Sequence, residues 1–67
     1  MKPYQERVVA EKAELDEKLA KLTAFIEQTD TFSTLDTAEQ DRLLAQMGVM
    51  GNYSRILGDR ITAFTTN

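Results

Sequence analysis

The longest apolar pattern in the chain is AEQDRLLAQMGVMGNYSRILGDRITAF, residues 38–64. Alternating steps of four and three residues through it give a seven-residue repeat of apolar side chains, interrupted by one serine. We call this repeat the inner seam, and its members are Leu43, Met47, Met50, Ser54, Leu57, Ile61 and Phe64. The repeat predicts a long helix that buries one face against a partner helix.

The same helix carries a second set of mainly apolar positions. We call this set the outer stripe, and its members are Val49, Tyr53, Ile56, Arg60 and Ala63. One partner helix cannot cover both faces, and a helix with so wide an apolar surface normally has more than one neighbour. A chain of 67 residues is too short to supply two long neighbours from itself. The outer stripe therefore predicts contact with other copies of the chain or with a ligand.

A second long helix is predicted before this one, over about residues 4–28. Pro3 suits the first turn of a helix, and apolar residues recur at coiled-coil spacing with Lys12 among them. These apolar residues are Val8, Leu15, Leu19, Leu22 and Ile26. On the charged side, Glu14 precedes Lys18 and Glu17 precedes Lys21 by four residues, an order that favours ion pairs.

Residues 29–36 predict a linker, because their hydroxyl and carboxylate side chains compete for backbone hydrogen bonds. Phe32 and Leu35 are its expected anchors, with a short helical turn between the two helices. The next helix should cover about residues 37–64. Its start offers two overlapping capping boxes, Asp36 with Glu39 and Thr37 with Gln40.

These elements predict an all-α fold, an antiparallel helical hairpin in which residues 1–67 form one domain. A domain of this size buries only about 60% of its unfolded surface. It usually needs additional stabilisation from disulfides, a bound metal or oligomerisation. Disulfides are excluded because the chain has no cysteine, and without histidine only weak carboxylate metal sites remain. We therefore expect the hairpin to assemble into a homo-oligomer.

The charge pattern limits the partners. The formal net charge is −3, and the lysines and arginines are scattered among more numerous acidic residues. Binding to duplex nucleic acid depends on clustered cations, so duplex DNA or RNA is not expected as a partner. The charged start of the chain and the lack of a long apolar run predict neither a signal peptide nor a membrane span. We expect a cytoplasmic protein.

An enzymatic function is not expected. The chain has no histidine or cysteine, no serine with an adjacent base, and no glycine-rich loop after a strand. Its neighbouring carboxylates, such as Asp16 and Glu17, are typical of a solvated helix face. We predict no catalytic residues, no metal and no cofactor.

Two further stripes could bind a ligand. The Tyr4 stripe comprises Tyr4, Arg7, Glu11, Glu14, Lys18, Lys21 and Phe25, and offers an aromatic ring for base stacking and cations for phosphate. The glycine stripe comprises Leu44, Gly48, Gly51, Arg55, Gly58 and Thr62. Each glycine costs up to about 1 kcal/mol in a helix. The stripe therefore predicts close approach of another helix or of a flat ligand.

The chain resembles a known family in these residues. The run from Gln5 to Val9, the segment 14–26, the linker anchors Phe32 and Leu35, and the spaced apolar residues from Leu43 to Ile61 are similar to the small phage proteins of the Acb/Tad hairpin family. Members of that family are anti-CBASS sponges, and they are related to the hairpin of the Thoeris anti-defence sponges. The similarity covers nearly the whole chain.

The resemblance implies a homohexamer that sequesters cyclic oligonucleotide messengers in the infected bacterial cell without cleaving them. It implies pockets between copies for cyclic dinucleotides such as 3′,3′-cGAMP, lined by Tyr4 and by Lys18 or Lys21. It also implies a second pocket for cyclic trinucleotides such as cyclic triadenylate, in which Arg60 matters. The Tyr4 stripe adds Arg7 to the dinucleotide pocket. The glycine stripe adds Arg55 and Thr62 to the trinucleotide pocket.

A different class of function is also open. A helical hairpin with an exposed apolar stripe can bind another polypeptide as a coiled-coil-like interaction module. The two hypotheses differ in whether cyclic nucleotides stabilise the protein.

Overall fold

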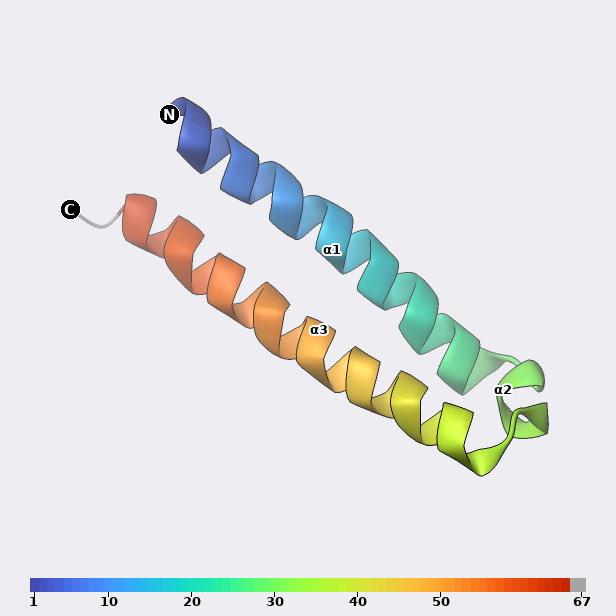
Figure 1. Ribbon diagram of the computed structural model, residues 1–67. Coiled ribbons are helices and arrows are strands. Elements are labelled where there is room, and N and C mark those ends of the chain that lie inside the picture. Colours follow the sequence, from blue (N-terminus) through green and yellow to red (C-terminus); the bar gives the residue numbers. More distant parts are fainter. Residues whose placement is uncertain (66–67) are drawn as a thin grey trace.

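The computed structural model describes residues 1–65 and shows two long antiparallel helices joined by a short helical turn (Figure 1). The helices are α1 (Pro3–Gln28), α2 (Thr31–Thr34) and α3 (Thr37–Phe64). The molecule is a rod of 48 × 15 × 15 Å. This architecture confirms the predicted all-α helical hairpin and the helical turn in its linker. We call the end where α1 begins and α3 ends the open end, and the α2 end the closed end.

Local polar contacts fix the ends of α1. Pro3 occupies the first helical position, and the backbone N–H of Lys2 donates to the Gln5 side chain at 2.9 Å. At the other end, the Thr29 hydroxyl donates to the Phe25 carbonyl oxygen at 2.6 Å. That bond occupies one of the carbonyls that a helix end leaves without an N–H partner.

The start of α3 differs in part from the predicted capping boxes. Asp36 is the N-cap, and its carboxylate accepts from the Glu39 backbone N–H at 2.7 Å. The Glu39 carboxylate pairs with Arg42 at 2.8 Å. The predicted box of Thr37 with Gln40 is wrong, because the Gln40 amide instead donates to the Leu35 carbonyl at 2.8 Å. Gln40 thus ties α3 to the linker that precedes it.

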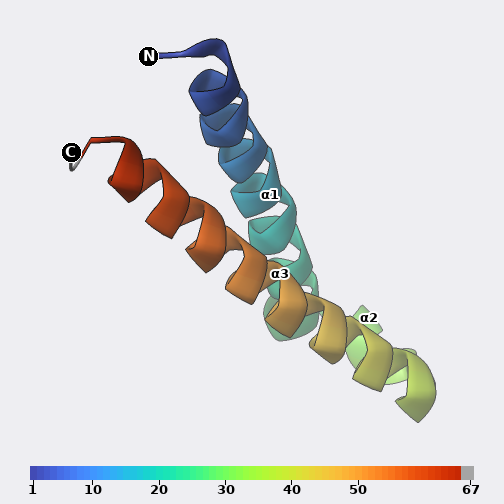
Figure 2. The same ribbon diagram turned by 60° about the vertical axis from the view of Figure 1, so that its left-hand side comes forward.

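The inner seam packs against α1, but the core it forms is very small. Among residues 1–65 only Val8 and Leu57 are buried apolar residues, and of these only Leu57 is fully buried. The other members of the seam are partly exposed, because each helix meets only one neighbour, and the two helices cross at an angle (Figure 2). A hairpin with two buried residues has little hydrophobic stabilisation of its own. No helix in the described part of the chain has the length and apolarity to cross a bilayer.

A polar contact sits inside this interface. The Lys12 ammonium donates to Asp16 at 2.6 Å, and the Asp16 carboxylate also accepts a hydrogen bond from the Ser54 hydroxyl of α3. The hydrogen bond from Lys12, and to a smaller extent that from Ser54, lowers the pKa of Asp16 below its ordinary value. Gly58 lies against the Lys12 stem, so that a Cβ there would be 3.3 Å from the Lys12 Cε. The serine and the lysine of the two apolar faces therefore belong to one contact that fixes the register of α1 on α3.

Candidate functional site

The outer stripe is exposed in the single chain. Val49 is 70% exposed, Tyr53 41% and Ile56 42%, and Arg60 and Ala63 are also exposed. The helix therefore has two apolar faces, as predicted, of which α1 covers only the inner seam. A row of large apolar side chains in water is a surface that another molecule can cover.

Tyr4 lies at the open end with its ring partly free. It is 47% exposed, and its ring meets the Phe64 ring edge to face, with centroids 5.8 Å apart and planes at 83°. Phe64 contacts one side of the tyrosine, and the exposed part of the ring is available for stacking. Sequence reasoning assigned Phe64 to the inner seam only. Its position opposite Tyr4 at the open end of an antiparallel hairpin was the signal that could have placed it in the site.

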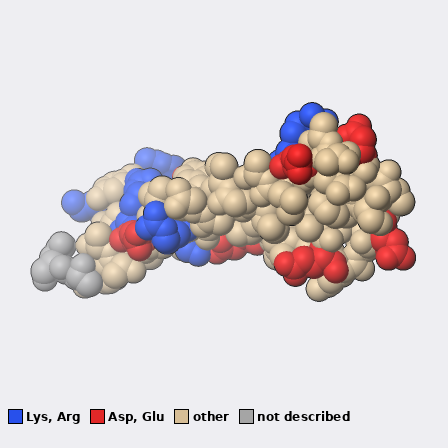
Figure 3. Space-filling view, turned by 90° about the horizontal axis from the view of Figure 1, so that it is seen from below, with Lys and Arg blue, Asp and Glu red and all other residues tan. Residues whose placement is uncertain are grey.

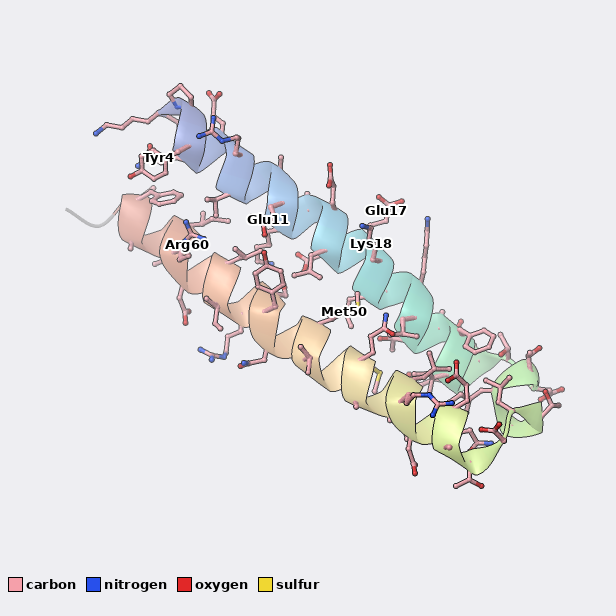
Figure 4. All side chains as sticks on the ribbon, in the orientation of Figure 1. Tyr4, Glu11, Glu17, Lys18, Met50 and Arg60 are labelled. Carbon is pink, nitrogen blue, oxygen red and sulfur yellow. The ribbon has the colours of Figure 1, made fainter. Side chains whose placement is uncertain are left out.

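Tyr4 and Arg60 belong to the same end of one chain. Arg60 is one turn before Phe64 on α3, about 6 Å along the axis, and Phe64 contacts Tyr4. Figure 4 shows Tyr4, Glu11 and Arg60 together in the half with the open end, with Lys18 and Met50 closer to α2. The structure thus brings together an aromatic ring and a guanidinium that the resemblance assigned to two different pockets.

The predicted cations fall into two groups. Within residues 1–65, Arg7, Lys18 and Arg60 form no ion pair. Lys21 pairs with Glu17 at 3.3 Å. The expected pair of Glu14 with Lys18 is not formed in the described chain. An arginine or lysine without an intramolecular carboxylate keeps its donors for another anion.

Arg55 is engaged within its own helix. It donates to Asp59 at 3.0 Å and to the Asn52 side chain at 2.9 Å. On the same stripe, the Thr62 carbonyl accepts from the Thr65 backbone N–H at 3.2 Å and from the Thr65 hydroxyl at 3.0 Å. An anion at Arg55 would compete with Asp59, whereas one at Arg60 has no such competitor among residues 1–65.

The three glycines of the glycine stripe have different surroundings. A Cβ built on Gly48 or Gly51 meets nothing within 4 Å, whereas one on Gly58 meets Lys12. Gly58 is thus explained by packing inside the hairpin. Gly48 is exposed and Gly51 half-buried, and a methyl group would fit at either position without contact from the rest of residues 1–65.

Tyr4 and Lys18 do not meet in one chain. They are fourteen residues apart on α1, which places them about 21 Å apart along its axis. A rod 15 Å thick presents both side chains on its surface rather than around a ligand. A site that uses both residues therefore needs a second chain, in which Lys18 of one copy comes close to Tyr4 of another.

Charge is unevenly distributed along the rod. The half with the open end, residues 1–16 and 54–67, has five Lys or Arg and five Asp or Glu, so its charge is zero. The half with the closed end, residues 17–53, has three Lys or Arg and six Asp or Glu, so it carries the whole net charge of −3. On the face drawn in Figure 3, most of the lysines and arginines lie in the half with the open end, and acidic side chains predominate in the half with the closed end. The open end is the less repulsive end for an anionic ligand.

Comparison with known proteins gave one family. The family model described as Sequestin matches residues 2–63. No curated protein and no solved structure matches the chain. The matched segment includes Tyr4, Lys18, the whole outer stripe and Arg60. The match extends over nearly all of α1 and α3, and the chain belongs to the Sequestin family.

Proposed function

We propose that the protein sequesters cyclic oligonucleotide second messengers of CBASS immunity by binding them between copies of the helical hairpin. The match to the Sequestin family supports the general function, because the name of the family denotes sequestration. The resemblance to phage anti-CBASS sponges supports the ligand class. In this proposal the protein acts in the infected bacterial cell and lowers the free concentration of the messenger.

The observation that carries the ligand class is the chemistry of the open end. A partly exposed tyrosine lies next to the helix turn that presents Arg60. Bases stack on aromatic rings, and a guanidinium matches phosphate oxygens with two parallel hydrogen bonds. A cyclic oligonucleotide carries both groups in each unit. We assign Tyr4 to a base, and Arg60, Arg7 and Lys18 to phosphates.

Arg55, Thr62 and Lys21 are weaker members of the proposed site. Arg55 and Lys21 each have a carboxylate partner in their own helix. A ligand phosphate would have to displace that carboxylate. We therefore rank Lys18 above Lys21 for the dinucleotide, and Arg60 above Arg55 for the trinucleotide.

Binding without cleavage is the second part of the proposal. The chain contains no histidine and no cysteine. The interhelical carboxylate, Asp16, has a lowered pKa, so it is less basic than an ordinary aspartate. A general base needs a pKa near the working pH. Messenger recovered from heat-denatured protein should therefore be chemically intact.

A thermal-shift titration with 3′,3′-cGAMP and with cyclic triadenylate tests the proposal. Ligand at about 1,000 times its Kd adds about 4 kcal/mol to the stability of the folded state. For a domain of this size the melting temperature should rise by roughly 15 °C or more. Linear dinucleotides of the same bases serve as the matched ligand control. If neither cyclic ligand changes the melting temperature, the proposed ligand class is wrong.

Variants of the two lysines sharpen the assignment. Lys18→Ala should weaken dinucleotide binding, whereas Lys21→Ala removes a cation that already has a partner and should change it little. Equal losses in both variants would indicate long-range charge rather than a phosphate contact.

The exposure of the outer stripe favours a second candidate function, a coiled-coil-like module that binds another polypeptide. Val49, Tyr53 and Ile56 have the spacing that a partner helix requires. This function predicts no thermal shift with any cyclic nucleotide. The same titration therefore separates the two candidates.

A further inference from the structure

The Tyr4 ring depends on one neighbour for its orientation. Tyr4 lies in the first turn of α1, which begins at Pro3, and helix ends open more readily than helix interiors. Within residues 1–65 its phenol hydroxyl makes no hydrogen bond. The side chain is 47% exposed, and its ring contacts Phe64 with the centroids 5.8 Å apart. Phe64 is therefore the group that can fix how this ring is turned.

Phe64 itself is held in place by the end of α3. It is the last residue of that helix and is half-buried as part of the inner seam. The turn that carries it is closed by Thr65, whose backbone N–H and hydroxyl both donate to the Thr62 carbonyl, at 3.2 and 3.0 Å. These bonds occupy a carbonyl that a helix end would otherwise leave without an N–H partner. Phe64 thus has a defined position, and Tyr4 points from α1 toward it (Figure 4).

The geometry of the pair leaves the tyrosine free to stack. The two ring planes are at 83°, an edge-to-face arrangement. Two rings in this arrangement do not cover each other, so at least one face of Tyr4 stays clear of Phe64. A base stacks on the face of an aromatic ring. Phe64 therefore orients Tyr4 without occupying all of the surface that a base would use.

We propose that Phe64 is a positioning residue, which holds the Tyr4 ring at the open end so that a free face of the ring meets the base of a cyclic dinucleotide. This role rests on the proposed function, in which Tyr4 stacks on a base. Ordering a mobile side chain during binding lowers the affinity, and a ring that is ordered beforehand avoids that loss. The contribution of one aromatic pair corresponds to about a two- to tenfold change in Kd.

The first arm of the test needs no ligand. The chain has two tyrosines and no tryptophan, so Tyr4 is the sole tyrosine in a Tyr53→Phe background. Its near-ultraviolet circular dichroism then reports whether the ring is held in one orientation. In this background Phe64→Leu keeps an apolar side chain in the inner seam but removes the second ring. The tyrosine signal should lose most of its intensity, while far-ultraviolet circular dichroism shows an unchanged helix content.

Phe32→Leu is the matched control. It makes the same chemical change at a half-buried position of α2, at the closed end. The tyrosine signal should be unchanged in this variant. If leucine at position 64 lowers the helix content, Phe64→Met replaces it, because methionine fills irregular apolar space.

The second arm measures the Kd for 3′,3′-cGAMP by calorimetry, with Tyr53 retained. Phe64→Leu should raise the Kd about two- to tenfold, and Phe32→Leu should not. Phe64→Tyr restores an aromatic ring and should restore most of the affinity.

Three results would overturn the proposal. An unchanged tyrosine signal in Phe64→Leu would show that Phe64 does not hold the ring, and a lost signal with an unchanged Kd would show that holding it does not matter for the ligand. These two results would refute only the positioning role. Failure of the natural chain itself to bind 3′,3′-cGAMP would refute the proposed function for the dinucleotide, and the positioning role with it.

Discussion

Replacement of Leu57 by alanine should remove much of the stability of the fold. Leu57 is 0% exposed and is the one fully buried apolar side chain among residues 1–65. Truncation of a buried leucine to alanine costs about 2–5 kcal/mol. A chain of this length has a total stability of roughly 3–10 kcal/mol at common values per residue. Leu57→Ala should therefore lose a large part of the free energy of unfolding.

Ile56→Ala is the matched control. It is the next residue on the same helix and loses the same number of carbon atoms, but it is 42% exposed in the single chain. Within one hairpin its truncation should cost no more than about 1 kcal/mol. If a second copy covers the outer stripe, Ile56→Ala should also raise the protein concentration needed to reach a given stability.

Urea denaturation followed by circular dichroism measures both effects, at a low and a high micromolar concentration of protein. Leu57→Ala should unfold at much lower urea at both concentrations, and Ile56→Ala mainly at the lower one. A cost below about 1 kcal/mol for Leu57→Ala would refute the assignment of the core to the inner seam. Equal costs for both variants at every concentration would refute the distinction between the two faces.

Three further predictions concern the polar contact, the glycines and the ligand site. The lowered pKa of Asp16 adds stability that is present above the ordinary value of 3.8 and lost as the pH falls below it; Asp16→Asn should remove this part of the pH dependence in urea titrations between pH 7 and pH 2.5, and an unchanged profile would contradict it. Gly48→Ala should stabilise an isolated hairpin by about 1 kcal/mol, and Gly58→Ala should gain less because Lys12 must move; thermal melts compare them, and destabilisation by Gly48→Ala would indicate that another molecule lies against that backbone. Calorimetry should show that Tyr4→Ala abolishes dinucleotide binding and that Arg60→Ala lowers the affinity for both the dinucleotide and the trinucleotide. If Arg60→Ala lowers only the affinity for the trinucleotide, the two residues belong to separate pockets.

The sequence predicted the hairpin well because its two periodic patterns are long and uninterrupted. The inner seam runs over six spacings with one polar member, and its partner pattern on α1 has the same repeat. Ser54 and Lys12 are polar residues that interrupt the two facing apolar patterns. In the structure both donate hydrogen bonds to the Asp16 carboxylate, so they form one polar contact across the hairpin.

The site was less predictable, because helical spacing fixes which residues share a face but not which faces of two helices come together. Tyr4 and Arg60 were assigned separately since they are 56 positions apart in the chain. The antiparallel pairing of α1 with α3 places them at one end. The ion pairs of the lysines could not be predicted either. Lys18 and Lys21 each follow a glutamate by four residues, but among residues 1–65 only Lys21 is paired.

A single hairpin leaves a row of large apolar side chains exposed, and we expect copies of the chain to associate through them. Sedimentation equilibrium of the natural chain, without ligand and across the micromolar range, tests it most directly. We predict a mass at a multiple of 7.6 kDa, with dissociation on dilution accompanied by loss of helix. A folded species that stays at 7.6 kDa throughout would contradict the expected association.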